Sequence, residues 1–248
     1  MLTSTVLCIF EGQKREHDYF SSLQRALLND VDVIKCSYGN DIFELYDEIK
    51  DDDDLNIVDV IRDSKSCPEN KVLLEGFSSD DINQVYLFFD MECHDDKYLA
   101  KKLFSMLNRF SQEDDTGKLF ISYPMLEALR DIPSIDSFIK VMIDAKDCSG
   151  KVYKKLSADR GMNKYSQIKK LTASDWRSLI KINVEKANYI VNYNIHCDHC
   201  CEQVEILSSQ VKKLEEIDSI YVLSAFPLFA YYHIPKDTLS LKCNEHDH

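Results

Sequence analysis

The chain has 248 residues, 44% of them hydrophobic and 29% charged, with only six glycines and five prolines and a net charge of −13. This composition excludes a mostly disordered chain, and the absence of any run of about 18 apolar residues argues against a membrane span. Residues 1–130 hold 14 of the 30 Lys and Arg residues but 27 of the 43 Asp and Glu residues. The whole acidic excess therefore lies in the first half, which predicts two functionally different halves.

The cysteines and the N-terminus bear on the compartment. Nine cysteines, an odd number without framework spacing, favour a reducing environment over a disulfide scaffold. The N-terminus lacks a basic region followed by an apolar core and a cleavage site, so we expect no export signal. Together these features predict a cytoplasmic protein.

Strands and helices are expected to alternate in residues 1–130. Apolar or β-branched runs predict strands at 6–10, 31–36, 85–90 and 118–123. Helical periodicity predicts helices at 16–28, 41–50, 55–62 and 98–110, and a further helix that opens at Pro124. The four acids Asp51–Asp54 are expected to form a solvated loop or to cap the next helix, and residues 71–77 fit no single element. This alternation predicts an α/β domain with a mostly parallel sheet flanked by helices.

The strand pattern fades after about residue 131, which predicts a second, mainly helical domain over residues 131–248. Helical periodicity is found at 134–143, 175–192 and 200–214. Residues 220–232 are apolar enough to be buried. We see no internal repeat.

Two of the predicted strands end in carboxylates. Glu11 follows Ile9-Phe10, and Asp90 ends the most apolar strand, with Glu92 two residues further on the same side of an extended chain. Functional groups of a parallel sheet gather at the carboxyl ends of its strands, where Glu127 could join them. Acids brought together repel unless a cation neutralises them, and carboxylates suit Mg²⁺ or Mn²⁺. The alternative is that these acids are ordinary solvated strand ends.

These residues carry a resemblance to a known family. Phe10-Glu11-Gly12 after a strand, followed by an Asp-x-acid on a hydrophobic strand, resembles the Toprim domain of topoisomerases, primases and OLD-type nucleases. Glu16-x-x-Tyr19-Phe20 and Ser122-Tyr123-Pro124-x-x-Glu127-Ala128 resemble the RloB-like branch, which is found among bacterial anti-phage proteins. The resemblance covers residues 4–130.

The resemblance implies a metal-dependent nuclease that cuts RNA or DNA in anti-phage defence. Glu11 would match the first-strand glutamate, Asp90 the first acid of Asp-x-Asp, and Glu92 the second; these three would hold the metal. Glu127 would match the acid after the strand–proline junction and complete the catalytic set. RloB-like proteins also resemble effectors that work with an ABC- or AAA-type ATPase encoded nearby, so such a partner is expected. The sequence leaves the oligomeric state open, a homo-oligomer included.

The chain departs from the pattern at Glu92, because the family has aspartate there. The extra methylene leaves open a shifted metal preference or a catalytically weakened module that only binds nucleic acid or a partner protein. Asp95 or Asp96 could compensate. A third alternative is nucleotidyl transfer, as in primases.

Residues 151–170 form the one basic segment, with seven basic residues and one acid. Lysine and arginine neutralise phosphates, and the interleaved Tyr153 and Tyr165 could stack on bases. The alternative is a solvated helix face. The predicted nucleic-acid contacts are Lys151, Lys154, Lys155, Arg160, Lys164, Lys169 and Lys170.

A zinc site is a further alternative in the second half. Cys197-x-x-Cys200 and Cys243-x-x-His246 together offer a Cys₃His ligand set for structural Zn²⁺. The two pairs are far apart in sequence, and no second Cys-x-x-Cys is present. The competing interpretation is a loop between helices that holds buried thiols.

Overall fold

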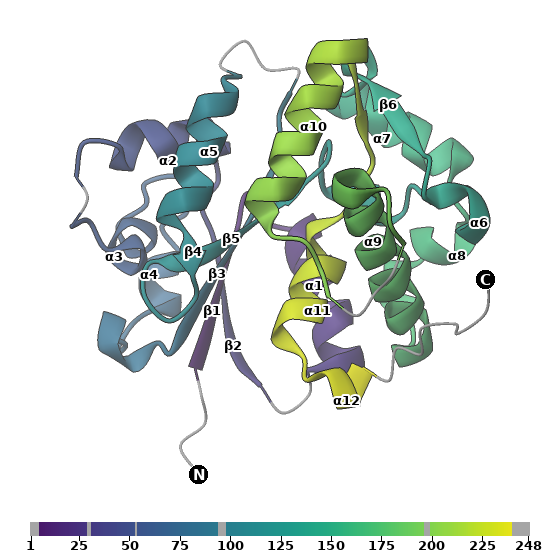
Figure 1. The fold of residues 1–248 in the computed structure, drawn as a ribbon. Coiled ribbons are helices and arrows are strands. Elements are labelled where there is room, and N and C mark those ends of the chain that lie inside the picture. The colour runs from purple at the N-terminus through teal and green to yellow at the C-terminus, as the bar shows by residue number, and fades with distance from the viewer. Residues whose placement is uncertain (1–4, 29–30, 53, 94–97, 196–198, 240–248) are drawn as a thin grey trace.

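The computed structural model describes residues 5–28, 31–52, 54–93, 98–195 and 199–239. Its main sheet has five strands in the order β2-β1-β3-β5-β4 (Figure 1). The first four of these pair in parallel, and only β4 is antiparallel to its neighbour. The prediction of an α/β fold with a mostly parallel sheet is confirmed. The strands are β1 (Thr5–Phe10), β2 (Asp32–Ser37), β3 (Gln84–Asp90), β4 (Ser111–Gln112) and β5 (Gly117–Ser122).

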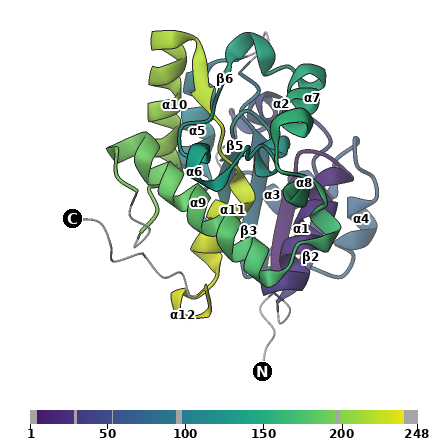
Figure 2. The ribbon, with the colours of Figure 1, turned by 90° about the vertical axis from the view of Figure 1, so that its right-hand side faces the viewer.

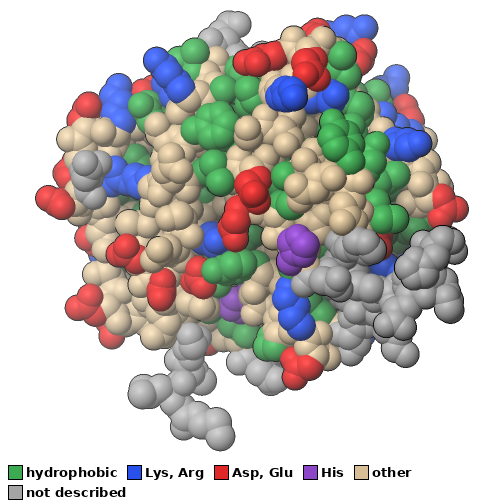
Figure 3. Space-filling view, viewed as in Figure 1, with side chains coloured by type: hydrophobic (Ala, Val, Ile, Leu, Met, Phe, Trp, Pro, Cys, Tyr) green, Lys and Arg blue, Asp and Glu red, His purple; other side chains and the backbone are tan. Residues whose placement is uncertain are grey.

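Helices cover both faces of this sheet. On one face lie α2, α3, α4 and α5, and on the other lie α1, α9 and α11, which Figure 2 shows in front of the strands. On the face seen in Figure 3, acidic side chains are spread over the side where α2, α3 and α5 lie, in agreement with the acidic first half of the sequence. The first-half helices are α1 (Arg15–Leu27), α2 (Ile42–Ile49), α3 (Ile57–Arg62), α4 (Asn70–Leu73) and α5 (Ala100–Arg109).

The second half is mainly helical, as predicted. Its helices are α6 (Ile135–Phe138), α7 (Gly150–Arg160), α8 (Asn163–Ser166), α9 (Ala173–Asn192), α10 (Gln203–Ile217), α11 (Ala225–His233) and α12 (Lys236–Leu239). A small antiparallel ribbon joins β6 (Met142–Asp144) to β7 (Ser219–Tyr221). Short 3₁₀ helices are η1 (Ser79–Asp81), η2 (Leu126–Leu129), η3 (Ala145–Asp147) and η4 (Ile168–Lys170).

The two halves share one hydrophobic core, because α11 of the second half packs on the sheet of the first. Side chains alternate along a strand, so Phe88 and Phe120 point to the same face. The ring of Phe226 lies 5.0 Å from that of Phe88, and the ring of Phe229 lies 5.9 Å from that of Phe120. The change of sequence pattern near residue 130 therefore does not coincide with a break in the core.

Two predicted helices are wrong. Residues 134–143 do not form one helix, because the chain leaves α6 after Phe138 and enters β6, where pairing with β7 replaces helical hydrogen bonds. Buried Lys186 of α9 fixes this exit by donating to the carbonyls of Phe138 and Val141, at 2.7 and 2.8 Å. Pro124 does not open a helix either, since Met125 after it is fully extended and η2 begins only at Leu126.

Candidate metal centre

The sheet register brings the ends of β1, β3 and β5 to one edge. Phe10 pairs with Phe88, and Asp90 pairs with Ser122. The backbone N–H of Glu11 donates to the carbonyl of Phe88 at 3.1 Å, and a carboxylate oxygen of Glu11 accepts from the N–H of Asp90 at 3.0 Å. Glu11 therefore reaches across from its own strand end to the neighbouring one.

Glu11, Asp90 and Glu92 form a three-carboxylate cluster at this edge. Each offers one oxygen, and the three oxygens lie within 4.8 Å of one another. The oxygen ligands of an octahedral ion with bonds of about 2.1 Å lie about 2.9 to 4.2 Å apart. The cluster is thus close to the separation that one Mg²⁺ or Mn²⁺ requires, and its donor set consists of the hard oxygens that these ions prefer.

The electrostatics of the cluster favour a cation. The pKa of Glu11 is raised to about 8, mainly by burial and also by the charges of Glu92, Glu16 and Asp41, while the hydrogen bond from the N–H of Asp90 lowers it. Burial, followed by the charge of Glu11, raises the pKa of Asp90 well above its ordinary value. Like charges held together in a poorly solvated place become stable in the ionised form when a divalent ion binds.

Glu92 joins the cluster by a backbone conformation that the sequence does not predict. We expected an extended chain past Asp90, but Glu92 has a φ of 51°, in the left-handed region. Met91 before it is fully buried, and its N–H donates to the carbonyls of Ser122 and Pro124. This conformation costs a residue with a side chain about 1 kcal/mol, and such strain is often found at functional sites.

Glu127 lies in the same cavity but outside the three-carboxylate cluster. Its side chain is 2% exposed and forms an ion pair with Arg15 at the start of α1. The cavity has a volume of about 430 Å³. All four acids predicted for the site thus line one cavity, together with Lys154 of α7.

Sequence reasoning missed Glu16 as a member of the site. Glu16 also lines the cavity, and burial, followed by the charge of Glu127, raises its pKa. An ideal Cβ at Gly12 would lie 2.7 Å from both carboxylate oxygens of Glu16. A side chain at this position would displace the Glu16 carboxylate, and Gly12 is not in the left-handed region. The signal in the sequence is an acid four residues after Gly12, in the first turn of a helix.

The basic segment divides into side chains with different surroundings. Lys154 faces the acidic cavity, whereas Lys151, Lys155 and Lys170 are exposed. The others have carboxylate partners: Arg160 with Asp131 at 2.5 Å, Lys164 with Asp175 at 2.5 Å, and Lys169 with Asp18 at 3.4 Å.

The expectation that the two tyrosines of this segment stack on bases is wrong. Tyr153 and Tyr165 are 0% and 1% exposed, and the hydroxyl of Tyr153 donates to Asp131 at 2.7 Å. Both rings belong to the hydrophobic core. Nucleic-acid contact by the lysines of the segment stays a prediction.

Other predicted ligands fall outside the part of the chain that the structure describes. These are Asp95 and Asp96, and three of the four candidate zinc ligands, Cys197, Cys243 and His246. Cys200 is described and partly buried, and burial raises its pKa to about 12. Zinc therefore stays an untested prediction.

None of the helices described is both long and apolar enough to cross a membrane. Neither family models, nor curated proteins, nor solved structures give a match to this chain.

Proposed function

We propose that this protein is a divalent-metal-dependent nuclease that hydrolyses phosphodiester bonds of RNA or DNA. The observation that carries the proposal is the cluster of Glu11, Asp90 and Glu92, three carboxylates from neighbouring strand ends within 4.8 Å of one another. The order of the motifs, which resembles that of RloB-like Toprim nucleases, adds support. By the same resemblance we infer that it is an effector of anti-phage defence, and the odd number of cysteines without framework spacing favours the cytoplasm.

The residues that line the cavity would have different roles in the reaction. Glu11, Asp90 and Glu92 would hold Mg²⁺ or Mn²⁺ through their oxygens, and the ion when bound supplies charge neutralisation and an activated water. Lys154 lines the same cavity as these acids and is exposed, so its ammonium can meet a phosphate there. The Arg15–Glu127 ion pair holds the start of α1 against η2, which orients the wall that carries Glu16.

The decisive experiment compares the wild type with Glu11→Gln in cutting assays on RNA and DNA with Mg²⁺ or Mn²⁺. Loss of one metal-binding carboxylate is expected to lower the rate at least about 100-fold, a loss of about 2.7 kcal/mol of transition-state stabilisation. Glu215→Gln, on an exposed position of α10, is the matched control and is expected to cut normally. Cutting that survives Glu11→Gln would show that the metal site is wrongly assigned.

A second candidate function is a module that binds nucleic acid or a partner protein without cutting. It is favoured by Glu92, whose side chain is one methylene longer than the aspartate of the pattern. Glu92→Asp separates the two functions: it is expected to raise the cutting rate if the longer side chain is a handicap. Binding of nucleic acid by a wild type that cuts nothing with either metal would favour the second function.

An ATPase partner follows from the same resemblance. Co-expression with an ATPase encoded beside this protein is expected to yield a complex and to raise cutting in the presence of ATP. Nucleotidyl transfer, the third alternative, predicts incorporation of labelled nucleotides into a primer. Cutting without incorporation would reject it.

A further inference from the structure

The outer side of α7 carries a groove, on the same helix that lines the metal cavity. Gly150 and Lys154 of α7 line that cavity. The groove has a volume of about 580 Å³ and contains Val152, which is 44% exposed. It is lined by Lys151, Val152, Lys155, Leu156, Asp159 and Arg160. One helix therefore connects the three-carboxylate cluster with a groove on the surface.

The helical repeat fixes the order of the side chains around α7. Successive residues are turned by about 100° around the axis, so Lys154, Lys151 and Lys155 follow one another away from the cavity. Val152 and Leu156 come next, on the side opposite the cavity. The Cβ atoms of residues four apart, such as Lys151 and Lys155, are separated by about 5 to 6 Å, which lets their ammonium groups contact neighbouring phosphates of one strand. Three cations therefore lead from the cavity to an apolar strip.

The charges on this side of α7 favour an anionic partner. Lys151 and Lys155 are exposed, and neither forms an ion pair with any residue that the structure describes. Arg160 is neutralised by the buried Asp131, and Asp159 is the one acid that lines the groove. Three lysines and one acid thus lie on the outer side of α7, in a chain whose net charge is −13.

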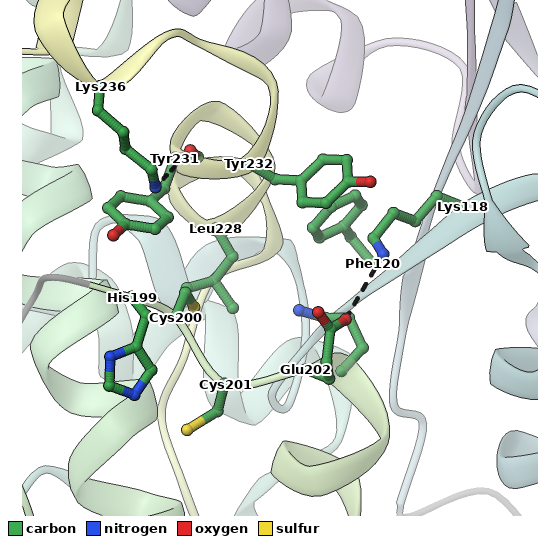
Figure 4. A pocket seen from close by; sticks show the side chains of 11 residues that line it. Lys118, Phe120, His199, Cys200, Cys201, Glu202, Leu228, Tyr231, Tyr232 and Lys236 are labelled. Carbon is green, nitrogen blue, oxygen red and sulfur yellow. Dashed lines mark hydrogen bonds and ion pairs between the residues drawn. The ribbon is translucent and has the colours of Figure 1, made fainter.

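The pocket in Figure 4, between β5, α10 and α11, differs because its lysines already have partners. Nζ of Lys118 lies 4.3 Å from the centre of the Tyr232 ring and 3.5 Å from a carboxylate oxygen of Glu202. Among the described residues, no ring and no acid takes such a place against Lys151 or Lys155. A phosphate can therefore approach α7 without displacing an internal contact.

We propose that α7 binds a single-stranded segment of the nucleic acid that enters the metal cavity. The phosphates pass from Lys154 to Lys151 and Lys155, and an unpaired base packs on Val152 and Leu156. The bases of a duplex are stacked inside it, so only an unpaired base reaches an apolar strip on the protein. This inference rests on the proposed nuclease function and names the substrate class of the same site.

Fluorescence anisotropy with the full chain tests this contact separately from cutting. The probes are a labelled single strand of about 12 nucleotides and the duplex that it forms with its complement, each as RNA and as DNA. A metal chelator prevents cutting, and low salt strengthens phosphate contacts. In at least one of the two forms, the single strand is expected to bind at least about tenfold more tightly than its duplex.

The phosphate contacts are tested by replacing two lysines at once. Lys151→Gln with Lys155→Gln is expected to weaken binding of the single strand about tenfold and to reduce its salt dependence, because two phosphate contacts are lost. Lys212→Gln with Lys213→Gln removes the same charge from α10 and is the matched control. The control is expected to bind as the wild type does.

The apolar strip is tested by Val152→Ser. This variant is expected to weaken binding of the single strand about threefold and to leave binding of the duplex unchanged, because a base loses its apolar contact. Val204→Ser is the matched control, since Val204 of α10 is 39% exposed. Circular dichroism confirms that each variant is folded.

The proposal is overturned if the wild type binds neither probe, or if the duplex binds as tightly as the single strand. It is also overturned if the double lysine variant binds as the wild type does, or if Val152→Ser has no effect on the single strand. Glu11→Gln is expected to bind the single strand normally although it does not cut. Failure of this contact is thus distinguishable from failure of the proposed metal centre.

Discussion

Asp90 and Asp131 are both held in the protein interior, but their partners differ. Asp131 is 0% exposed and is surrounded by donors: the guanidinium of Arg160 contacts both of its oxygens at 2.5 Å, and the hydroxyl of Tyr153 donates at 2.7 Å. Asp90 instead lies beside Glu11 and Glu92, and burial and their charges raise its pKa. Asp131 is thus neutralised and hydrogen-bonded by its neighbours, whereas Asp90 is surrounded by like charges.

This difference separates a structural acid from a functional one. A buried charge with a complete set of donors keeps the chain folded, and removing it leaves its partners unsatisfied. A cluster of acids that crowd one another opposes folding and is retained where an ion or a proton relieves the repulsion. Stability measurements and activity measurements should therefore respond oppositely in the two regions.

The largest effect on stability is expected for Asp131→Asn. The substitution keeps the shape of the side chain but leaves the charge of Arg160 without its partner in a partly buried place, which costs about 3 to 5 kcal/mol. Urea denaturation measures the free energy of unfolding, with Asp159→Asn on the exposed side of α7 as the matched control. A loss below about 1 kcal/mol would mean that the pair is not structural.

A smaller effect is expected from pH in the presence of a metal chelator. The pKa of Glu11 is about 8 in the folded chain against an ordinary 4.5, so the folded state holds the proton more tightly. This stabilisation is complete below pH 4.5 and is lost as the pH rises to 8. A difference of one pKa unit between the folded and unfolded chain corresponds to about 1.4 kcal/mol, and access of solvent to the carboxylate reduces this value. We therefore expect the free energy of unfolding to fall by about 2 kcal/mol in total.

Glu11→Gln provides the control for that pH dependence. Denaturation curves of the wild type and the variant should agree near pH 4 and separate toward pH 8, where the wild type is less stable. Mn²⁺ at pH 8 should restore the stability of the wild type, because the ionised carboxylates bind it, but should not affect the variant. A difference in stability between the wild type and the variant that is the same at every pH would mean that the pKa of Glu11 is not raised in the folded chain.

The sequence predicts the cluster of Glu11, Asp90 and Glu92 better than it predicts the surroundings of Asp131. Apolar runs that end at Glu11 and Asp90 are local patterns, and the rule that strand ends meet at one edge brings them together. The partners of Asp131 lie 22 and 29 residues away and depend on how α7 packs, which no local pattern reports. The ribbon of β6 and β7 is missed for the same reason, since each strand has three residues and pairs with a distant one.

The geometry of the cluster depends on details that residue type does not encode. The sequence predicts Glu92 beside Asp90, but by an extended chain rather than by the left-handed conformation that Glu92 adopts after the buried Met91. The close approach of the Glu16 carboxylate to Gly12 is likewise visible only in the structure. Tyr153 and Tyr165 show the converse, because both are buried in the core although the segment around them is basic.

The smallest effect on stability is expected for Glu92→Asn. This substitution tests whether charge repulsion or the left-handed backbone at residue 92 opposes folding. Asparagine tolerates the left-handed region better than glutamate and removes one of the repelling charges, so the chelated protein should gain up to about 1 kcal/mol. Asp218→Asn is the matched control, because Asp218 has a φ of 53° at the end of α10 but lies outside the cluster. A gain for Glu92→Asn well above that of the control, together with loss of Mn²⁺ binding by calorimetry, means that charge and not backbone conformation opposes folding at this edge. Equal gains would assign the whole effect to the backbone.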